Sequence, residues 1–302
     1  MKVQLIYNPA SGTHSDLNLE NLRLAFQACS AEVAVTETSI EGDVAFEPGC
    51  DLVCVSGGDG ALRLVVRAAV RAKLSAPICV YPAGTVNLIA KEIGYSSDPG
   101  KFASSAMAGL IKGDTARLSA PVIVYDDQAF VACLSAGPDG LAVAGHSPAL
   151  KKRLGGMAYA IAAIKLLYSW PLCRFELEVK QEDLSIRALS CEAFYIAKGR
   201  HYAGNWSLAE EARLQSDQFY LLALRVARRR HFLRFILQIA MGRDPAALKF
   251  VEKMATRSLV LKSHAPEEAS RAFQIDGDVL PHPVEKVEML DESITYCIPV
   301  DD

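Results

Sequence analysis

The sequence lacks the features that would place it in several large classes of protein. No uncharged apolar run among its 302 residues approaches the ~20 residues that a membrane-spanning helix needs. The first residues, MKVQLIYNPASG, do not have a signal-peptide layout. The net charge is only −3 at pH 7, and aromatic residues are not interleaved with basic ones, so no nucleic-acid partner is expected. We therefore expect a soluble, cytoplasmic protein whose contact with membranes is peripheral.

Paired cysteines and histidine clusters are also missing. The eight cysteines are scattered, none forms CxxC, and most lie in apolar segments. This distribution predicts small core residues in a reducing cytoplasm and argues against a disulfide framework or a zinc site. The six histidines are not spaced as metal ligands or as a Ser/His/Asp set. The cysteines stand at positions 29, 50, 54, 79, 133, 173, 191 and 297.

Apolar residues, by contrast, make up 51% of the chain, enough for a sizeable core in one large domain or two ordinary ones. Over the first 112 residues, apolar segments with strand character alternate with segments of helical spacing. This alternation predicts a parallel sheet with flanking helices. The predicted strands are 2–7, 32–35, 51–55 and 76–81, and the predicted helices are 17–29, 61–73, 87–93 and 99–112.

The stretch DLVCVSGGDG, residues 51–60, joins a buried strand to a helix through a glycine-rich turn. Gly57, Gly58 and Gly60 would let the backbone turn sharply and approach a ligand closely. The free N–H groups at the helix start would then bind an anion, most commonly a phosphate. The turn lacks the Gly-Lys-Ser/Thr ending of a P-loop and does not match GxGxxG. A plain strand-to-helix turn would explain the stretch equally well.

Two further strands end in similar turns, Asn8-Pro9-Ala10-Ser11-Gly12 and Pro82-Ala83-Gly84-Thr85-Val86-Asn87. Each alone could be an ordinary loop. The carboxyl ends of parallel strands share one edge of the sheet, where ligands of open α/β sheets bind. The convergence of three such turns therefore predicts a phosphate or nucleotide site.

After about residue 117 the apolar segments become short and alternate as in β-structure, which suggests an antiparallel sandwich or barrel. Two helical stretches interrupt them, one over 147–168 and one over 228–241 that continues through 246–253. The predicted strands are 117–125, 129–135, 175–180, 186–198, 218–225, 257–262, 272–275, 284–289 and 294–300.

The motifs YNPASG, SGGDG, YPAGTVN, AGPDG, GRHYAGN…SDQ and QIDGD resemble, in order and spacing, those of the diacylglycerol kinase catalytic-domain family. This family includes soluble bacterial lipid kinases and the sphingosine and ceramide kinases, and it is related to the NAD kinases. The resemblance implies an α/β nucleotide-binding domain over 1–118, with 291–302 returning to it, and a β-sandwich domain with inserted helices over 119–290. It also implies ATP and Mg²⁺ between them.

Carried over position by position, the resemblance implies a nucleotide site on the first domain. Thr38 matches the family's threonine in the second turn, and Thr36 fits that place less well. The implied nucleotide-binding residues are Asn8, Ala10, Ser11, Gly12, Thr38, Gly57, Gly58, Asp59, Gly60, Gly84, Thr85 and Asn87.

The resemblance also implies a metal site and a base in the second domain. Asp217 resembles the family's metal-binding aspartate, with the carbonyls of Leu214 and Phe219 beside it. Asp139 and Asp59 would serve as acids that reach the ion through water. A solvated turn aspartate would explain Asp217 without a metal.

Asp276 in Asp276-Gly277-Asp278 matches the acid that receives the proton of the lipid hydroxyl. Asp278, which the resemblance also implies to be catalytic, stands where the family has a glutamate and is one methylene shorter. A hairpin turn would explain the same three residues.

Several positions depart from the family pattern. Ala61, Arg63 and Leu64 replace the residues that usually follow GGDG, and Leu88 replaces an aspartate after PxGTxN. The glycine-rich run before the metal turn is reduced at 203–205. Part of the usual network of hydroxyls and carboxylates is therefore missing.

The predicted helix that starts near Arg228 has arginines on one face and Phe232, Phe235, Ile236 and Ile239 on another. Basic residues beside apolar ones suit an anionic membrane surface. A solvated face above a packed stripe explains the pattern equally well.

These observations lead to an ATP-dependent lipid kinase that transfers the γ-phosphate to a lipid hydroxyl, with a diacylglycerol-like lipid as the expected substrate. The alternatives are a kinase of a soluble substrate, like the NAD kinases, and a non-catalytic nucleotide- or lipid-binding protein. An exposed sandwich edge would allow a homodimer. The identity of the lipid is not encoded in any motif.

Overall fold

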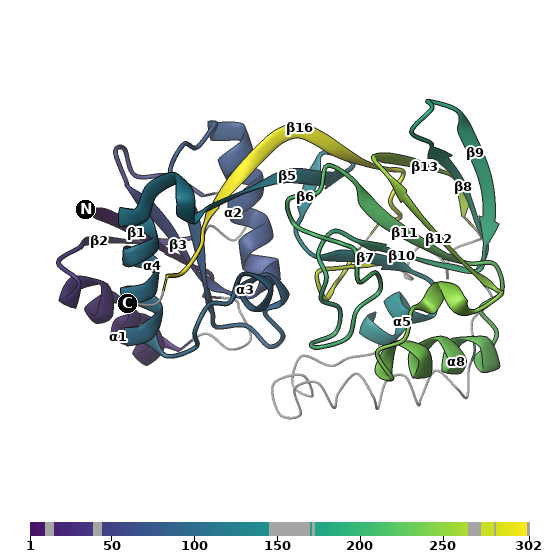
Figure 1. The fold of residues 1–302 in the computed structure, drawn as a ribbon, viewed down its shortest axis with the longest axis horizontal. Helices are drawn as coiled ribbons and strands as arrows, with labels where there is room; N and C mark the ends of the chain where they lie inside the picture. Colours follow the sequence, from purple (N-terminus) through teal and green to yellow (C-terminus); the bar gives the residue numbers. More distant parts are fainter. Residues whose placement is uncertain are drawn as a thin grey trace. The chain divides into compact units, whose positions relative to one another are not determined.

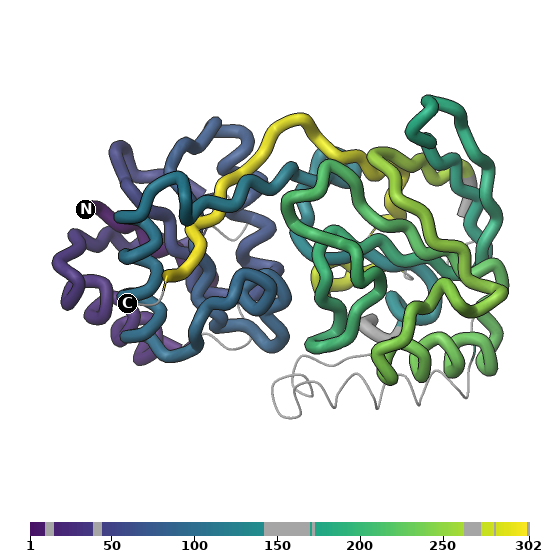
Figure 2. Tube along the Cα trace, viewed as in Figure 1, coloured from purple at the N-terminus to yellow at the C-terminus, as the bar shows by residue number. Residues whose placement is uncertain are grey.

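The computed structural model describes residues 1–9, 15–38, 44–144, 170, 173–264, 273–280 and 282–300. The chain forms two compact units, Met1–Val122 with Asp291–Asp302, and Ile123–Leu290 (Figure 1). The tube in Figure 2 shows the last, yellow segment of the chain returning to the unit that contains the first, purple one. In the described part of the chain no helix combines the length and the apolar character needed to cross a bilayer.

The first unit has a parallel sheet with the strand order β2-β1-β3-β4, as the alternation of strands and helices predicts. The end of strand β16 (Lys286–Cys297) pairs beside β4 through Tyr296 and Ile78. The elements are β1 (Lys2–Tyr7), α1 (Asp16–Ala28), β2 (Glu32–Glu37), β3 (Leu52–Gly57), α2 (Asp59–Ala72), β4 (Ile78–Pro82), α3 (Leu88–Ile93), α4 (Pro99–Lys112) and η1 (Gly113–Ala116).

Helices flank this sheet in the doubly wound manner. The chain steps from β1 to β2 in one direction and from β3 to β4 in the other, so right-handed crossovers put α1 and α2 on opposite faces. Helices α1 and α4 pack together through Phe26 and Phe102, whose rings meet edge to face with centroids 6.0 Å apart. The strand order reverses between β1 and β3, and ligands of open α/β sheets bind at such a reversal.

The C-terminal segment is bonded to the helical side of the same unit. The amide of Ile298 donates to Ala116 O at 2.9 Å, and the amide of Val300 donates to Ser105 O at 3.0 Å. A Cβ on Gly109 would overlap the carbonyl of Ile298, so glycine is needed where the tail crosses α4.

The second unit has two antiparallel sheets. One has the order β12-β11-β10-β7-β14-β15, and the other contains β9-β8-β13 and the first part of β16. Strand β5 (Arg117–Tyr125) begins in the first unit and ends in the second. The other elements are β6 (Gln128–Phe130), β7 (Cys133–Ala136), α5 (Pro138–Ala144), β8 (Phe175–Lys180), β9 (Ile186–Cys191), β10 (Ala193–Ala197), β11 (Phe219–Leu224), α8 (Arg229–Ala240), η2 (Pro245–Ala247), β12 (Val251–Thr256), β13 (Ser258–His264), β14 (Phe273–Ile275) and β15 (Asp278–Val279).

The two sheets pack face to face around an aromatic centre. Phe175 of β8 contacts Phe194 of β10 and Phe273 of β14, with ring centroids 5.3 and 5.8 Å apart. All three side chains are fully buried, and side chains on β8 alternate between buried and partly exposed. Contacts between strands of different sheets through one apolar core define a sandwich, which confirms the predicted fold class.

The structure corrects some of the predicted elements. The predicted strand 129–135 is split into β6 and β7, the strand 186–198 is split into β9 and β10, and the segments 284–289 and 294–300 belong to one long β16. The predicted helix 147–168 lies outside the described residues.

The predicted continuation of a helix through 246–253 is wrong. The Asp244 side chain accepts the N–H of Ala246 at 2.9 Å and starts the short helix η2, after which the chain enters β12 and pairs with β11. The local helical spacing was therefore overridden by strand pairing.

Candidate active site

The ends of the four parallel strands lie level with one another in the first unit. Tyr7 pairs with Glu37 on one side and with Ser56 on the other, and Gly57 pairs with Pro82. The residues that follow these positions therefore leave the sheet at one edge, as the sequence predicts for the turns after β1, β3 and β4. The predicted ligands Ala10, Ser11 and Gly12 lie outside the described residues, whereas the half-buried Asn8 directly follows β1.

The turns after β3 and β4 touch backbone to backbone. A Cβ on Gly84 would lie 2.6 Å from Asn87 Oδ1, 2.9 Å from Gly58 N and closer still to Gly58 Cα. A Cβ on Gly58 would meet Gly84 Cα at 3.2 Å. Gly84 therefore needs to be glycine for the two turns to approach each other, whereas a side chain at Gly58 would require a small shift of its neighbour.

Asp59 joins the same two turns through its side chain. Its Oδ2 accepts the N–H of Leu88 at 2.8 Å, and its Oδ1 accepts the N–H of Ile89 at 3.0 Å. These two amides belong to the first turn of α3, which has no partner for them within the helix. Asp59 is buried, so the geometry gives it a positioning task and does not support its expected role as an acid that reaches a metal through water.

Asn87 also shapes its own turn. It has a left-handed backbone, with φ = +56°. Its Oδ1 accepts the N–H of Gly84 at 2.8 Å, and its Nδ2 donates to Gly84 O at 2.7 Å and to Pro82 O at 3.2 Å. The predicted ligand Thr85 is exposed within the loop that these bonds close.

The structure distinguishes the two threonines of the second turn. Thr36 Oγ1 accepts a hydrogen bond from Gln4 Nε2 at 2.9 Å and is used inside the sheet. Thr38 follows β2, and its backbone N–H donates to Tyr7 O at 2.9 Å. Its side chain is only 4% exposed, and Oγ1 has no hydrogen-bond partner among the described residues. A buried hydroxyl without a partner is costly, so Thr38 fits a ligand-binding position.

Helix α2 starts at this edge with Gly58 as its N-cap residue. Predicted ligand Gly60 lies in its first turn, where amide groups cannot bond within the helix. The helix dipole and these N–H groups favour an anion. Because Asp59 points its carboxylate at α3, it does not fill this position with its own charge. The edge is therefore suited to phosphate.

In the second unit, Asp276 is held by a row of amides. Its Oδ1 accepts N–H groups from Ala132 at 2.9 Å and Cys133 at 3.1 Å, and its Oδ2 accepts the N–H of Val131 at 3.0 Å. Asp276 and Gly277 form the two-residue turn between β14 and β15, with φ values of +48° and +84°. Asp276 therefore lies in a hairpin turn, and its carboxylate is at the same time held in one orientation by backbone amides.

Gln274 connects this hairpin to the Gly137-Pro138-Asp139-Gly140 segment. Its Oε1 accepts the N–H of Gly277 at 3.0 Å, and its Nε2 donates to Ser135 Oγ at 2.9 Å. Asp139 Oδ2 accepts a short hydrogen bond from the Ser135 hydroxyl and a longer one, 3.4 Å, from Gln274 Nε2. Two motifs that are far apart in the sequence therefore share one network.

Asp139 also affects two buried tyrosines. Burial raises the pKa of Tyr202 well above its usual value, and the negative charge of Asp139 adds to this effect. Burial and then the same carboxylate raise the pKa of Tyr195 in the same way. Both phenols remain protonated near neutral pH. Asp278, the other predicted catalytic acid, is exposed at the start of β15.

The predicted metal turn does not fit a bound Mg²⁺ in its present arrangement. Asp217 is 67% exposed, and its Oδ2 pairs with Arg257 Nη1 at 3.0 Å. Lys198, which is 3% exposed, donates from Nζ to the carbonyl oxygen of Ser216 at 2.5 Å. Mg²⁺ requires several oxygen ligands in an octahedron, and protein cations already contact two oxygens of this turn. Leu214 and Phe219, whose carbonyl oxygens were expected to bind the metal, are both buried.

No cluster of three or more His, Cys, Asp or Glu residues arranged for a metal occurs within the described ranges. The arrangement of residues 214–219 thus does not fit a resident metal ion.

Sequence reasoning missed Lys198, Gln274, Ser135 and Arg257. Lys198 directly follows the apolar strand β10, and a lysine buried at the end of such a strand needs a specific partner. Gln274 belongs to the QIDGD motif, but the sequence does not reveal the residues to which it is hydrogen-bonded.

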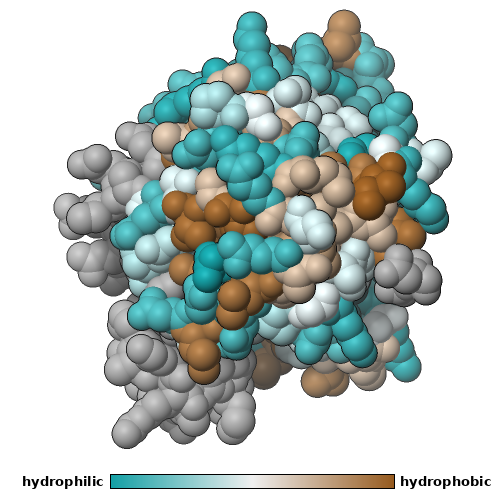
Figure 3. All heavy atoms as spheres, turned by 90° about the vertical axis from the view of Figure 1, so that its left-hand side faces the viewer, coloured by the Kyte–Doolittle hydropathy of each residue, from teal (hydrophilic) through white to brown (hydrophobic). Residues whose placement is uncertain are grey.

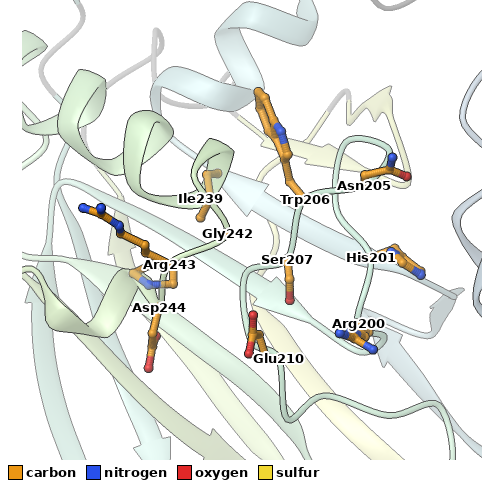
Figure 4. A pocket seen from close by; sticks show the side chains of 11 residues that line it. Arg200, His201, Asn205, Trp206, Ser207, Glu210, Ile239, Gly242, Arg243 and Asp244 are labelled. Atoms are coloured by element: carbon orange, nitrogen blue, oxygen red, sulfur yellow. The ribbon is translucent and has the colours of Figure 1, made fainter.

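A separate cavity of about 270 Å³ opens between residues 200–210 and the end of α8. Figure 4 shows Ser207 and Glu210 close together near its middle, with Arg243 and Asp244 from the other wall. Asp244 is paired with Lys253 at 2.9 Å. The lining carries charges of both signs, so it does not select a ligand class.

Comparisons with known proteins agree with this architecture. Residues 2–119 match the family model described as "Diacylglycerol kinase catalytic domain". A "Diacylglycerol kinase" of Staphylococcus saprophyticus is 24% identical over 234 residues, which is 75% of this chain and 73% of the relative. A "Probable lipid kinase YegS-like" of Pseudomonas aeruginosa is 29% identical over 211 residues, 65% of this chain and 64% of the relative. The matched region thus spans slightly less than two thirds of that relative.

Solved structures extend the agreement in fold to almost the whole chain. The crystal structure of "a putative diacylglycerol kinase" from Bacillus anthracis has a TM-score of 0.75 at 16% identity, and the match covers 98% of this chain and 95% of that one. A second structure of "a putative diacylglycerol kinase" from the same organism has a TM-score of 0.71 at 16% identity, with coverage of 98% and 96%. At this identity the structures establish the fold alone. The family model and the sequence relatives show that the chain is similar to diacylglycerol kinases and lipid kinases, which supports a phosphotransferase that acts on an alcohol group.

Proposed function

We propose that the protein transfers the γ-phosphate of ATP to a hydroxyl group of a lipid, with a diacylglycerol-like lipid as the preferred acceptor. The observation that carries this proposal is the carboxylate of Asp276, which three consecutive backbone amides hold in one orientation. The names of the sequence relatives, diacylglycerol kinase and lipid kinase, support a lipid as the acceptor.

In the proposed reaction the acceptor oxygen forms a bond to the γ-phosphorus. The bond between this phosphorus and the oxygen that bridges to the β-phosphate breaks, and ADP leaves. The hydroxyl proton passes to Asp276. A carboxylate that accepts three N–H groups is a weak base, and it suits a transfer in which the proton leaves late, when the phosphoryl group is already moving.

The first unit would hold the nucleotide. The glycine contact between Gly58 and Gly84, the start of α2 and the buried hydroxyl of Thr38 would bind its phosphates and a neighbouring polar group. Magnesium would arrive bound to the phosphates of ATP, where it usually retains several water molecules.

The test is transfer of labelled phosphate from ATP to a panel of acceptors that includes diacylglycerol, monoacylglycerol, a sphingoid base, phosphatidylglycerol and NAD. We expect labelling of a lipid, and we expect Asp276→Asn to lower kcat by about 10²- to 10⁴-fold. ATP binding should be retained, because the nucleotide-binding turns belong to the other unit.

Asp183→Asn is a matched control. Asp183 lies in the hairpin turn between β8 and β9, and its carboxylate also accepts a backbone N–H, from Ser185 at 3.0 Å. It should retain activity. Tight ATP binding without labelling of any acceptor would contradict the proposal and indicate a nucleotide-binding protein without turnover.

A further inference from the structure

Helix α8 has one face that is part of the core of the second unit. Phe232, Phe235 and Ile239 are buried, at the i, i+3 and i+7 spacing of one helical face. Phe235 packs on Tyr195 of β10, with ring centroids 4.9 Å apart, and Phe232 packs on Trp170 at 5.3 Å. The helix is therefore fixed on the sandwich by this face.

The opposite face of α8 is apolar as well, although it is exposed. Leu233, Leu237 and Met241 are 50%, 61% and 49% exposed. They are spaced by four residues, so they form one line along the helix. Single exposed apolar residues are ordinary, but a contiguous apolar surface marks a contact site.

Positive charge surrounds this line. Between residues 225 and 243 the sequence has six arginines and no acidic residue, in a chain whose net charge is −3. Arg228 lies 3.7 Å from Glu192, whereas the exposed Arg230, Arg234 and Arg243 have no ion-pair partner within the described ranges. The six arginines are Arg225, Arg228, Arg229, Arg230, Arg234 and Arg243.

The first unit provides a contrast. Its helix α1 exposes Leu17 and Leu24, but these residues share the helix with Asp16 and Glu20, and Glu20 is paired with Arg23. Figure 3, which shows the face on the left of Figure 1, has hydrophobic atoms interspersed with hydrophilic ones. Among the described residues, α8 thus combines an exposed apolar line with several arginines that have no ion-pair partner, whereas α1 does not.

We infer that α8 is a membrane-docking helix that lies flat on an anionic bilayer, with Leu233, Leu237 and Met241 inserted between the headgroups and the arginines bound to lipid phosphates. Arginine and apolar side chains on one short helix match the two layers of a bilayer surface, the charged headgroups and the acyl boundary. A helix of 12 residues cannot span the hydrocarbon core, since ~20 are needed. It can only lie in the plane of the surface.

A second copy of the chain is a poorer occupant of this face. A symmetric dimer would place the same patch on both sides of the interface, so arginines would face arginines. An anionic surface offers the complementary charge. The docking deepens the proposed lipid kinase function and relies on it for its purpose, because a lipid substrate is embedded in a membrane.

The experiment measures binding of the full chain to vesicles, without turnover. Vesicles of phosphatidylcholine alone are compared with vesicles that also contain phosphatidylglycerol. We expect binding only to the anionic vesicles, and we expect added salt to weaken it. The double variant Arg230→Gln/Arg234→Gln should bind about 30-fold more weakly, and Leu233→Ser/Leu237→Ser about tenfold more weakly.

Two double variants of the first unit serve as controls. Leu17→Ser/Leu24→Ser removes two exposed leucines, and Arg71→Gln/Lys112→Gln removes two exposed positive charges. Both should bind vesicles as the unmodified protein does. All variants should phosphorylate a short-chain, water-dispersed diacylglycerol at an unchanged rate, which also shows that they are folded.

Three results would overturn the docking role: equal binding to both kinds of vesicle, unchanged binding of the α8 variants, or loss of binding in the arginine variant alone. The last result would indicate simple charge adsorption, such as a nucleic acid would also give. Vesicle binding without phosphorylation of any lipid would refute the kinase function and leave the docking intact, whereas phosphorylation of the dispersed lipid without vesicle binding would refute only the docking.

Discussion

The ammonium group of Lys198 donates a hydrogen bond to the carbonyl oxygen of Ser216 over 2.5 Å, at a position that is almost closed to solvent. Ser216 precedes Asp217, the residue that resembles a metal ligand. A positive side chain therefore contacts this turn where the family resemblance implies a metal ion, and Arg257 pairs with Asp217 beside it. Charge balance at the turn is supplied by the chain itself.

This arrangement predicts that the fold of the second unit does not depend on divalent cations. The melting temperature should be the same with magnesium and with a chelator. Lys198→Met should lower the free energy of unfolding by about 1–3 kcal/mol, because it removes the hydrogen bond to the partly buried carbonyl of Ser216. Scanning calorimetry measures both effects. Lys180→Met, at an exposed lysine, is the control and should change little.

A rise in melting temperature on addition of magnesium, abolished by Asp217→Asn, would contradict this prediction. It would mean that Asp217 leaves Arg257 and binds the ion.

Asp59 should be more important for stability than its position in a glycine-rich turn suggests. Asp59→Asn retains the size of the side chain but replaces one acceptor oxygen by an NH₂ group, which cannot accept the N–H of Leu88 or Ile89. We expect a loss of about 1–3 kcal/mol in the free energy of unfolding. Weaker ATP binding should accompany it, since the turn after β4 is then released from the turn after β3.

Denaturant unfolding and ATP titration of the same variant check this expectation. Asp114→Asn changes an exposed aspartate of the same unit and should leave both quantities unchanged. An Asp59→Asn protein with normal stability would show that the two bonds to α3 contribute little.

The close approach of two glycine turns gives a steric prediction. Gly84→Ala would place a Cβ against the backbone of Gly58, so one turn must move. The expected cost is about 1–3 kcal/mol of stability, with a larger Kd for ATP. Gly100→Ala is the matched control, because its Cβ meets only Asp98 Oδ1 at 3.4 Å in the first turn of α4. Alanine there should be neutral or stabilising by up to about 1 kcal/mol.

Features that depend on residues close together in the sequence could be predicted, whereas contacts between residues far apart in the sequence could not. The approach of the turns after β3 and β4 could be predicted, because parallel strands share a carboxyl edge and the glycines of both turns are visible in the sequence. Asp276 was selected as a candidate acid because of its motif. Its three amide donors at 131–133 were not found, because they depend on β14 pairing with β7, which is distant in the sequence.

The same reason explains what was missed. Lys198 approaches Ser216 because residues on either side of β10 and β11 are brought together by strand pairing. The spacing of residues 246–253 favoured a helix, but β11 offered an edge and the segment became β12. Local patterns thus predicted the elements and the candidate acids, whereas partners across the sheets required the three-dimensional structure.

Removal of the buried hydroxyl of Thr38 should change the stability of the protein and its affinity for ATP with opposite signs. Thr38→Val has nearly the same shape but lacks the hydroxyl, which has no hydrogen-bond partner among the described residues. Removing a buried polar group that makes no bond should stabilise the ligand-free protein by up to about 1–2 kcal/mol. If a nucleotide group normally bonds to this hydroxyl, the same change should raise the Kd for ATP about five- to tenfold.

Thr36→Val, two residues away, is the control. It shows whether any Thr→Val change near the end of β2 has the effect expected for Thr38→Val. Thr36 Oγ1 accepts the bond from buried Gln4, so its loss should destabilise the protein by about 1 kcal/mol and leave ATP binding unchanged. Melting curves with and without ATP measure both quantities for both variants. Loss of stability in Thr38→Val, with unchanged ATP affinity, would show that the hydroxyl serves the fold, and it would remove Thr38 from the nucleotide site.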